Sequence, residues 1–180
     1  MIFSKANQKI YILMSFAMLT WAIAWTSAKI LNRYLDFYDL TFLRFFFGFI
    51  SLLPFIIGRS FNNIFFLNNI KYIGLTSILF FVYNICFFKA TFYGDAGKGA
   101  VLVTTINPIF TFLISSILAK QISKNELIGI LFGLIGGLLI LNVFNEGLSN
   151  ILHSKNIYFV ICGFIWGIMT VLMGKAQKNI

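Results

Sequence analysis

Charged side chains are scarce in this sequence. Only 11% of its 180 residues are Asp, Glu, Lys or Arg, whereas 59% are hydrophobic and the mean hydropathy is +0.91. A soluble domain of this size could not cover its surface with so few charges. The composition therefore excludes an ordinary soluble protein and indicates an all-α or β-barrel protein of the membrane.

Cysteine, histidine and acidic residues are also few, which removes several kinds of site. The chain has two cysteines, one histidine (His153, in a polar connection) and five acidic residues. Cys86 and Cys162 lie within apolar runs, and we interpret both as small core residues. Phosphate-binding glycine loops, nucleophile elbows, paired carboxylates and Cys/His metal spacings are not found in the sequence. We therefore expect no enzyme activity, cofactor or metal.

Apolar runs long enough to span a bilayer number six, and they do not alternate as barrel strands would. Each run has about 17 to 23 residues, which corresponds to roughly 26 to 35 Å of helix. The runs are 10–28, 40–57, 72–88, 97–119, 127–144 and 157–173. The sequence thus predicts an all-α membrane protein with six transmembrane helices, the first a retained span rather than a signal peptide.

Basic residues in the connections give the orientation. With the N-terminus inside, eight of them are cytoplasmic and five lie on the opposite side, which is the bias that membrane proteins show. The two groups are Lys5, Lys9, Arg59, Lys71, Lys120, Lys124, Lys175 and Lys178, and Lys29, Arg33, Lys89, Lys98 and Lys155. The net charge of +9 then reflects topology and attraction to anionic lipid, so no nucleic-acid partner is expected. We expect a multi-pass protein of a bacterial inner membrane with a cytoplasmic N-terminus.

Two segments of the chain resemble a known family. LTFLRFFFGFISLLPF (Leu40–Phe55) is similar to the second helix of the EamA-like branch of the drug/metabolite transporter superfamily, and Ala90–Leu141 resembles its third to fifth helices. WAIAWTSAK from Trp21 and WGIMTVLMGK from Trp166 match the place where that family has a Trp-Gly pair early in each repeat. The chain departs from the family pattern at Ala22, after Trp21, and at Lys120–Gln121, where a Gly-Glu pair is common.

The resemblance implies two five-helix repeats of inverted topology around a central site. Residues 6–145 would form the first repeat, and 146–180 would begin the second with a single helix. We expect truncation, although a half-sized subunit that forms a homodimer or pairs with a second half stays open. Gly163 and Gly167 of the sixth run form a small-residue face for which the sequence offers no partner.

Polar residues within the runs are the candidate substrate-binding residues, because polar groups in lipid are costly. Thr104, Asn107, Thr111 and Ser115 share one face of the fourth run, beside Pro108, which frees the carbonyl of Thr104. This patch either coordinates a solute or is a packing kink. Asn84 in the third run should face the bundle interior, where solute contact and helix-to-helix bonding are equally plausible.

Four further residues complete the candidate set. Trp21 and Trp25 lie one turn apart, deeper than an interfacial belt, and either stack on a solute or pack against neighbouring helices. Arg44 is the most embedded charge; it either snorkels to the interface or, like Lys29, supplies positive potential to a pathway.

The acidic residues all lie in connections or at the edges of runs, so the middle of the membrane has no carboxylate to bind a lipophilic cation. We therefore expect a permease that moves a small neutral, zwitterionic or anionic metabolite by alternating access, in an incomplete version. The alternative is a non-transporting remnant, or an accessory subunit that acts only by assembling with another membrane chain. The substrate is not defined by the resemblance, because the superfamily moves many solutes.

Overall fold

The computed structural model describes residues 5–57, 63–120, 124–147, 153 and 156–177. This part of the chain is helical and contains no strand. Its helices are α1 (Lys5–Leu31), α2 (Phe37–Ile56), α3 (Asn63–Tyr93), α4 (Ala96–Ala119), α5 (Lys124–Ile140), α6 (Val143–Glu146) and α8 (Ile157–Gln177). The predicted fold class, an all-α membrane protein, is confirmed.

Five helices are long and apolar enough to cross a membrane: α1, α2, α3, α4 and α8. The fifth predicted run, 127–144, is interrupted. Its helix α5 has 17 residues and ends at Ile140, Asn142 adopts a left-handed backbone with φ of 54°, and the single turn α6 follows. At about 1.5 Å per residue, α5 is some 26 Å long, close to the minimum for a span.

The helix boundaries follow local capping chemistry. Asp36 precedes α2 and its side chain accepts a hydrogen bond from the backbone of Phe37, and Asp95 precedes α4 and accepts one from Lys98 at 2.9 Å. Such N-cap carboxylates bind backbone N–H groups that have no partner within the helix. At the other end of α4, Lys120 is left-handed with φ of 52°. By contrast, α3 begins at Asn63, nine residues before the predicted run, because residues 63–71, which mix apolar residues with asparagines and a lysine, are also helical.

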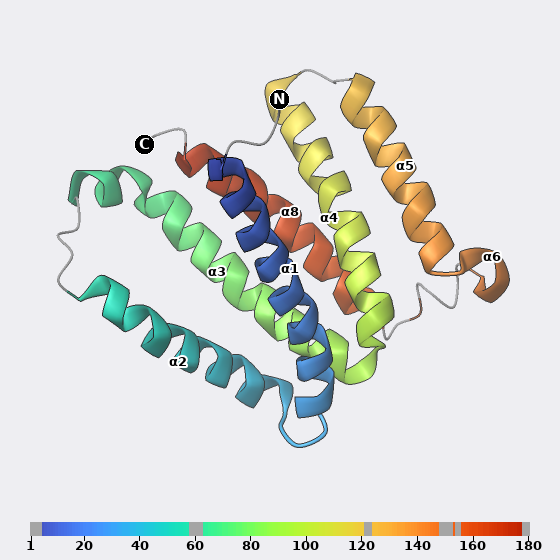
Figure 1. Cartoon of the computed structure of the whole chain (residues 1–180), viewed down its shortest axis with the longest axis horizontal. Helices are drawn as coiled ribbons and strands as arrows, with labels where there is room; N and C mark the ends of the chain where they lie inside the picture. Colours follow the sequence, from blue (N-terminus) through green and yellow to red (C-terminus); the bar gives the residue numbers. More distant parts are fainter. Residues whose placement is uncertain (1–4, 58–62, 121–123, 148–152, 154–155, 178–180) are drawn as a thin grey trace.

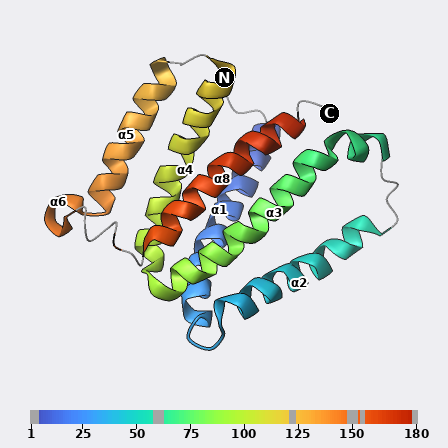
Figure 2. The ribbon, with the colours of Figure 1, turned by 180° about the vertical axis from the view of Figure 1, so that it is seen from behind.

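α8 occupies the centre of the arrangement. It lies between α3 and α4 and makes its most extensive contacts with these two helices, as Figure 2 shows. α1 crosses the opposite face in Figure 1, α2 packs against α3, and α5 packs against α4.

The glycines of α8 allow this central position. A Cβ at position 163 would come within 2.7 Å of the Ile106 side chain, and one at position 167 within 2.9 Å of Phe110. Both glycines therefore let α8 approach the backbone of α4 closely. The expectation that this small-residue face lacked a partner is wrong, since α4 fills it.

The buried core lies toward one end of the bundle, which we call the packed end. It comprises the C-terminal parts of α1 and α3 and the N-terminal parts of α2, α4 and α8. Its buried apolar residues include Trp25, Ala28, Leu40, Tyr83, Phe87, Phe88, Ala90, Leu102, Val103, Phe159 and Cys162. The ring of Phe159 is completely buried against Gly94 and Gly99, where a Cβ would overlap it.

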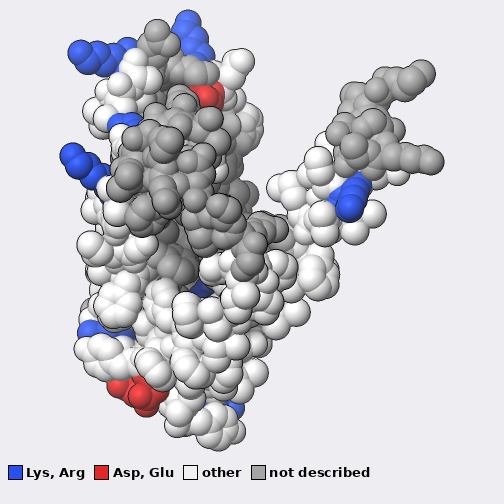
Figure 3. All heavy atoms as spheres, turned by 90° about the vertical axis from the view of Figure 1, so that its left-hand side faces the viewer, with Lys and Arg blue, Asp and Glu red and all other residues white. Residues whose placement is uncertain are grey.

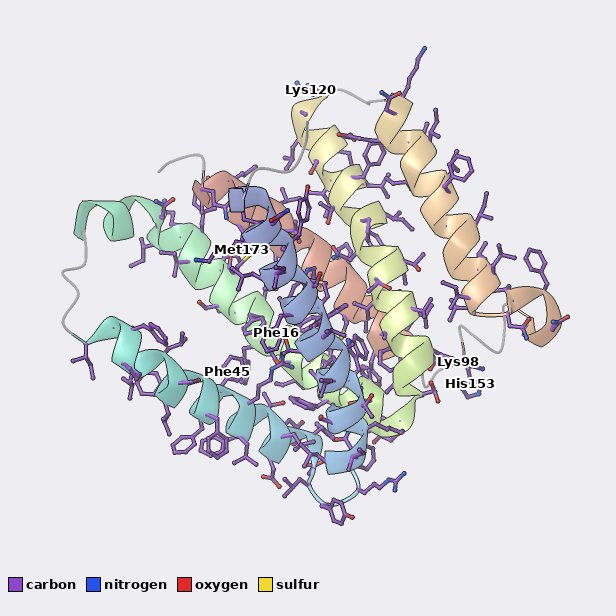
Figure 4. The ribbon with its side chains drawn as sticks, in the orientation of Figure 1. Phe16, Phe45, Lys98, Lys120, His153 and Met173 are labelled. Atoms are coloured by element: carbon purple, nitrogen blue, oxygen red, sulfur yellow. The ribbon has the colours of Figure 1, made fainter. Side chains whose placement is uncertain are left out.

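The opposite end, which we call the open end, is loosely associated. Every residue from Gln8 to Thr20 of α1 is exposed, and in Figure 3 this part of the chain stands away from the rest as an arm. The same view shows Lys and Arg side chains at both ends of the molecule. Figure 4 shows Lys98 at the packed end of α4 and Lys120 at its open end.

Candidate functional site

The predicted site residues fall into three separate places. Trp25 and Arg44 contact the ring of Phe87 on α3, Trp21 packs on Trp25, and Asn84 lies about one turn before Phe87 on the same helix. Lys29 lies at the packed end, and Thr104 and Asn107 line a groove on α4. The structure therefore does not bring all seven residues into a single site.

Aromatic rings connect α1 to α3 and α8. The Trp25 ring meets that of Phe87 edge-on, with centroids 4.8 Å apart, and Trp21 meets Trp25 in the same manner at 6.0 Å. On its other side Trp25 lies 5.9 Å from Phe159 of α8. Trp25 is 3% exposed, and its indole Nε1 has no hydrogen-bond partner among the described residues. Packing thus accounts for the ring of Trp25 but not for its buried donor.

Arg44 turns toward α3 rather than toward the end of its helix. Its guanidinium carbon lies 5.4 Å from the centroid of the Phe87 ring and 5.8 Å from that of Phe88. These are cation–π distances. No hydrogen bond or ion pair joins Arg44 to any residue that the structure describes. Arg44 thus leans on the rings of α3, although its side chain remains exposed.

Asn84 is fully buried, as expected for a polar residue that faces the interior. Its Nδ2 donates to the carbonyl of Phe80 at 2.7 Å, one turn earlier in α3, while its Oδ1 has no partner among the described residues. Tyr83 beside it stacks on Phe80 and packs against Trp166 of α8, with centroids 5.0 Å apart.

Lys29 binds the C-terminus of α3. Its Nζ donates to the carbonyls of Thr91, Phe92 and Gly94 at 2.9, 3.3 and 2.7 Å. Three residues on, Asn32 donates to the hydroxyl of Thr91 at 2.8 Å. The last carbonyls of a helix lack partners within it and carry partial negative charge. Lys29 thus closes the packed end, a use that competes with the predicted contact to a solute.

A polar groove of about 670 Å³ lies between α4, α5 and α8. It is lined by all four members of the predicted polar face of α4: Thr104, Asn107, Thr111 and Ser115. Thr111 donates to the Oδ1 of Asn107 at 3.0 Å, and the hydroxyl of Thr104 donates to carbonyls of its own helix. The shared face of these residues is confirmed. The volume of the polar groove is within the range of ligand pockets.

Sequence reasoning missed three groups that also line the polar groove. Glu126, in the first turn of α5, contributes a carboxylate at the open end, and Thr170 of α8 contributes a hydroxyl. On α5, Gly129 and Gly133 line the groove, whereas Gly137 packs on Thr105 of α4. The helical spacing of the glycines was visible in the sequence, but the point at which α5 separates from α4 was not.

A second groove, of about 720 Å³, lies between α3 and α8. We call it the aromatic groove, because Tyr72, Phe80 and Trp166 line it together with Met173, which Figure 4 labels on α8. Thr170 lines both grooves. The lining residues on α3 and α8 belong to their open-end halves, so the aromatic groove lies on the open-end side of the bundle.

The side chains in these places offer hydrogen bonds and aromatic surface for binding. Among the residues that the structure describes, no group of three His, Cys, Asp or Glu side chains is placed to hold a metal, and Cys86 and Cys162 are free thiols. The available groups are aromatic rings, hydroxyls, amides, the Arg44 guanidinium, the Lys29 ammonium and the Glu126 carboxylate.

Comparison with known proteins identifies a family. A family profile described as the EamA-like transporter family matches residues 8–142, which include α1 to α5 from Gln8 onward and exclude α8. Neither a curated protein nor a solved structure matches the chain. The members of this family are membrane transporters of the drug/metabolite type. The matched residues cover most of the chain, which therefore belongs to the EamA-like transporter family.

Proposed function

We propose that the chain is a carrier that moves a small neutral, zwitterionic or anionic metabolite across a bacterial inner membrane by alternating access. The observation that carries this proposal is the difference between the two ends of the bundle. The residues that line both grooves come from the middle and open-end parts of the helices, while Trp25, Phe87 and Phe159 fill the packed end. A bundle that is accessible from one side and sealed at the other is the arrangement that a carrier requires in one of its states.

The lining of the polar groove supports the proposed substrate class. Its deeper part presents the neutral groups of Thr104, Asn107 and Thr111, and the Glu126 carboxylate lies in the first turn of α5, at the open end. Hydroxyls and amides both donate and accept hydrogen bonds, so they suit polar solutes of no net charge. With a cytoplasmic N-terminus, the open end would face the cytoplasm.

Uptake into proteoliposomes that contain the purified chain tests the proposal. We expect saturable uptake of a member of a metabolite panel, and Asn107→Ala to reduce it about fivefold, since a lost hydrogen bond costs about 1 kcal/mol. Asn145→Ala, outside the grooves and bonded only to Asn142, is the matched control. Saturable uptake of quaternary ammonium compounds alone would contradict the substrate class.

One observation favours the second candidate, a subunit that acts by assembling with another membrane chain. A Cβ at Gly129 or Gly133 would meet no atom within 4 Å, so the wall of the polar groove on α5 is open to a helix of a second copy or of another membrane chain. A chain of this kind gives no uptake alone and is recovered from native membranes as a crosslinked complex. Uptake by the purified chain and crosslinking in native membranes therefore together separate the two candidates.

A further inference from the structure

Arg44 and Trp25 present two donors without acceptors beside the same aromatic ring. The Arg44 guanidinium lies over Phe87 at 5.4 Å, and Trp25 meets that ring edge-on at 4.8 Å. Neither Arg44 nor Trp25 Nε1 has an acceptor among the described residues. Trp25 Nε1 is buried, and a buried donor without an acceptor is rare in native proteins. The Arg44 side chain is exposed, but it lies within α2, a helix able to span the membrane, where a cation without a partner is costly. Together the two donors indicate a missing binding partner.

The position of Arg44 excludes the simplest explanation of its missing partner. A guanidinium that snorkels extends along its helix toward the interface, but this one lies across the gap from α2 to the rings of α3. Contacts with aromatic faces replace only part of the hydration of a cation. An anion bound in the same place would supply the rest.

We propose that Arg44 and the indole N–H of Trp25 form a binding site for the carboxylate of a small organic solute. The planar guanidinium offers paired donors that match a carboxylate, and charge-assisted hydrogen bonds of this kind are strong. Phe45 of α2, which Figure 4 labels and which packs on Phe80 and Phe81, provides apolar surface beside Arg44 for the rest of the solute. This inference rests on the proposed function, because it names the class of solute carried.

The site lies at the boundary between the two ends of the bundle. Leu40 and Thr41, one turn before Arg44, are buried in the packed end, and Trp21, one turn before Trp25, is partly exposed toward the arm of α1. Figure 3 shows the space between this arm and the rest of the molecule as an open wedge. A solute that enters the wedge would meet the guanidinium where the helices converge.

Binding to the detergent-solubilised full chain tests the proposal without any need for transport. The probes are acetate, 4-methylpentanoate, leucine and 3-methylbutylamine. The last three have the same branched carbon chain: 4-methylpentanoate carries only a carboxylate, leucine carries a carboxylate and an amine, and 3-methylbutylamine carries only the amine. Thermal stabilisation of the protein is measured for each. We expect stabilisation by the carboxylates, including leucine, and none by the amine. Stabilisation by the amine alone, or by none of the probes, would overturn the proposal.

Two variants test the named donors. Arg44→Gln should weaken carboxylate binding about tenfold to a hundredfold, and Trp25→Phe, which keeps a ring but removes the N–H, about fivefold. Arg33→Gln and Tyr34→Phe, in the exposed connection after α1, remove a matched charge and a matched ring donor and should bind as the unmodified chain does. Circular dichroism without ligand confirms that each variant is folded. Unchanged binding by folded Arg44→Gln contradicts the site.

Phosphatidylglycerol added to the micelles distinguishes a solute carboxylate from an anionic lipid head group. Stabilisation that depends on Arg44 and arises from the lipid but from none of the carboxylates would overturn the inference. Carboxylate binding that depends on Arg44 in a chain that transports nothing would leave the site in place and refute the carrier. Transport that is unchanged in Arg44→Gln, in a chain that binds no carboxylate, would refute the site and leave the carrier in place.

Discussion

Polar side chains in the helices are mostly bonded within the chain, and the exceptions are informative. Thr41, Ser51, Thr104 and Thr170 each donate to a carbonyl of their own helix, which satisfies a hydroxyl at membrane depth. Three buried side-chain atoms among the described residues lack a partner: Trp25 Nε1, Asn32 Oδ1 and Asn84 Oδ1. Trp25 lies on α1, Asn32 directly follows that helix and Asn84 lies on α3, and Lys29 joins these two helices.

At this scale Lys29 carries a prediction about stability. Replacing it by Met removes three hydrogen bonds from a charged donor to the carbonyls at the end of α3. We expect the free energy of unfolding to fall by about 2 kcal/mol, because hydrogen bonds to charged groups contribute more than neutral ones. Unfolding in mixed detergent micelles, titrated with SDS, measures the change.

Lys124→Met provides the control. It removes the same charge, and Lys124 is exposed at the start of α5. Lys29→Arg keeps the cation and should recover part of the loss. Equal stabilities of the two Met variants would show that the bonds at the end of α3 do not hold the packed end together.

At the scale of elements, glycines with the same spacing differ in what they contact. Gly133 and Gly137 lie one turn apart on α5, yet a Cβ at position 137 would lie 2.5 Å from the Thr105 hydroxyl, and one at position 133 would meet nothing within 4 Å. α5 therefore touches α4 near its C-terminal end and separates from it along the polar groove. The spacing predicts a small-residue face, whereas the contact depends on the path of the neighbouring helix.

The pair gives a sharp test of this packing. Gly137→Ala should destabilise the protein by about 1 to 3 kcal/mol through overpacking against Thr105. Gly133→Ala should be neutral or stabilise it by up to about 1 kcal/mol, because alanine favours helix where space is free. Unfolding in micelles measures both variants.

A second substitution identifies the cause of the loss. Thr105→Ala removes the nearest atoms, so combining it with Gly137→Ala should restore much of the stability. If Gly137→Ala alone proves as stable as Gly133→Ala, α5 does not pack on α4 as described.

At the scale of the whole molecule, the helices converge at one end and diverge at the other. α8 closes the packed end by inserting Phe159 between α3, α4 and the Trp25 ring, and Gly94 and Gly99 make room for it. The grooves on either side of α8 remain open. This asymmetry gives the fold a direction across the membrane.

Labelling from one side of the membrane tests that direction. Single-cysteine variants Lys9→Cys and Asn145→Cys, with both native cysteines replaced by Ala, mark the two ends of the α1 to α5 unit. With a cytoplasmic N-terminus, a membrane-impermeant maleimide added to intact cells should label position 145 and spare position 9, since five spans put the two ends on opposite faces. Labelling of both positions from the same side would refute the five-span repeat.

The sequence by itself determined the membrane environment, the helices and the polar face of α4. These follow from apolar run length and from a 3.6-residue period, which are local properties of the chain. It also indicated that Asn84 is interior, because an amide facing lipid is costly. The break after Ile140 was not foreseen, because apolar residues continue past it to Phe144.

Only the tertiary structure decided which helices meet. Lys29 donates to carbonyls more than sixty residues along the chain. Arg44 contacts the rings of α3, and the glycines of α8 pack against α4. These pairings depend on how the helices cross, and no local period records that. In the sequence the seven candidate residues were alike as polar, charged or aromatic residues within or at the end of apolar runs. The fold separates Lys29 at the packed end and Thr104 and Asn107 in the polar groove from the residues near Phe87.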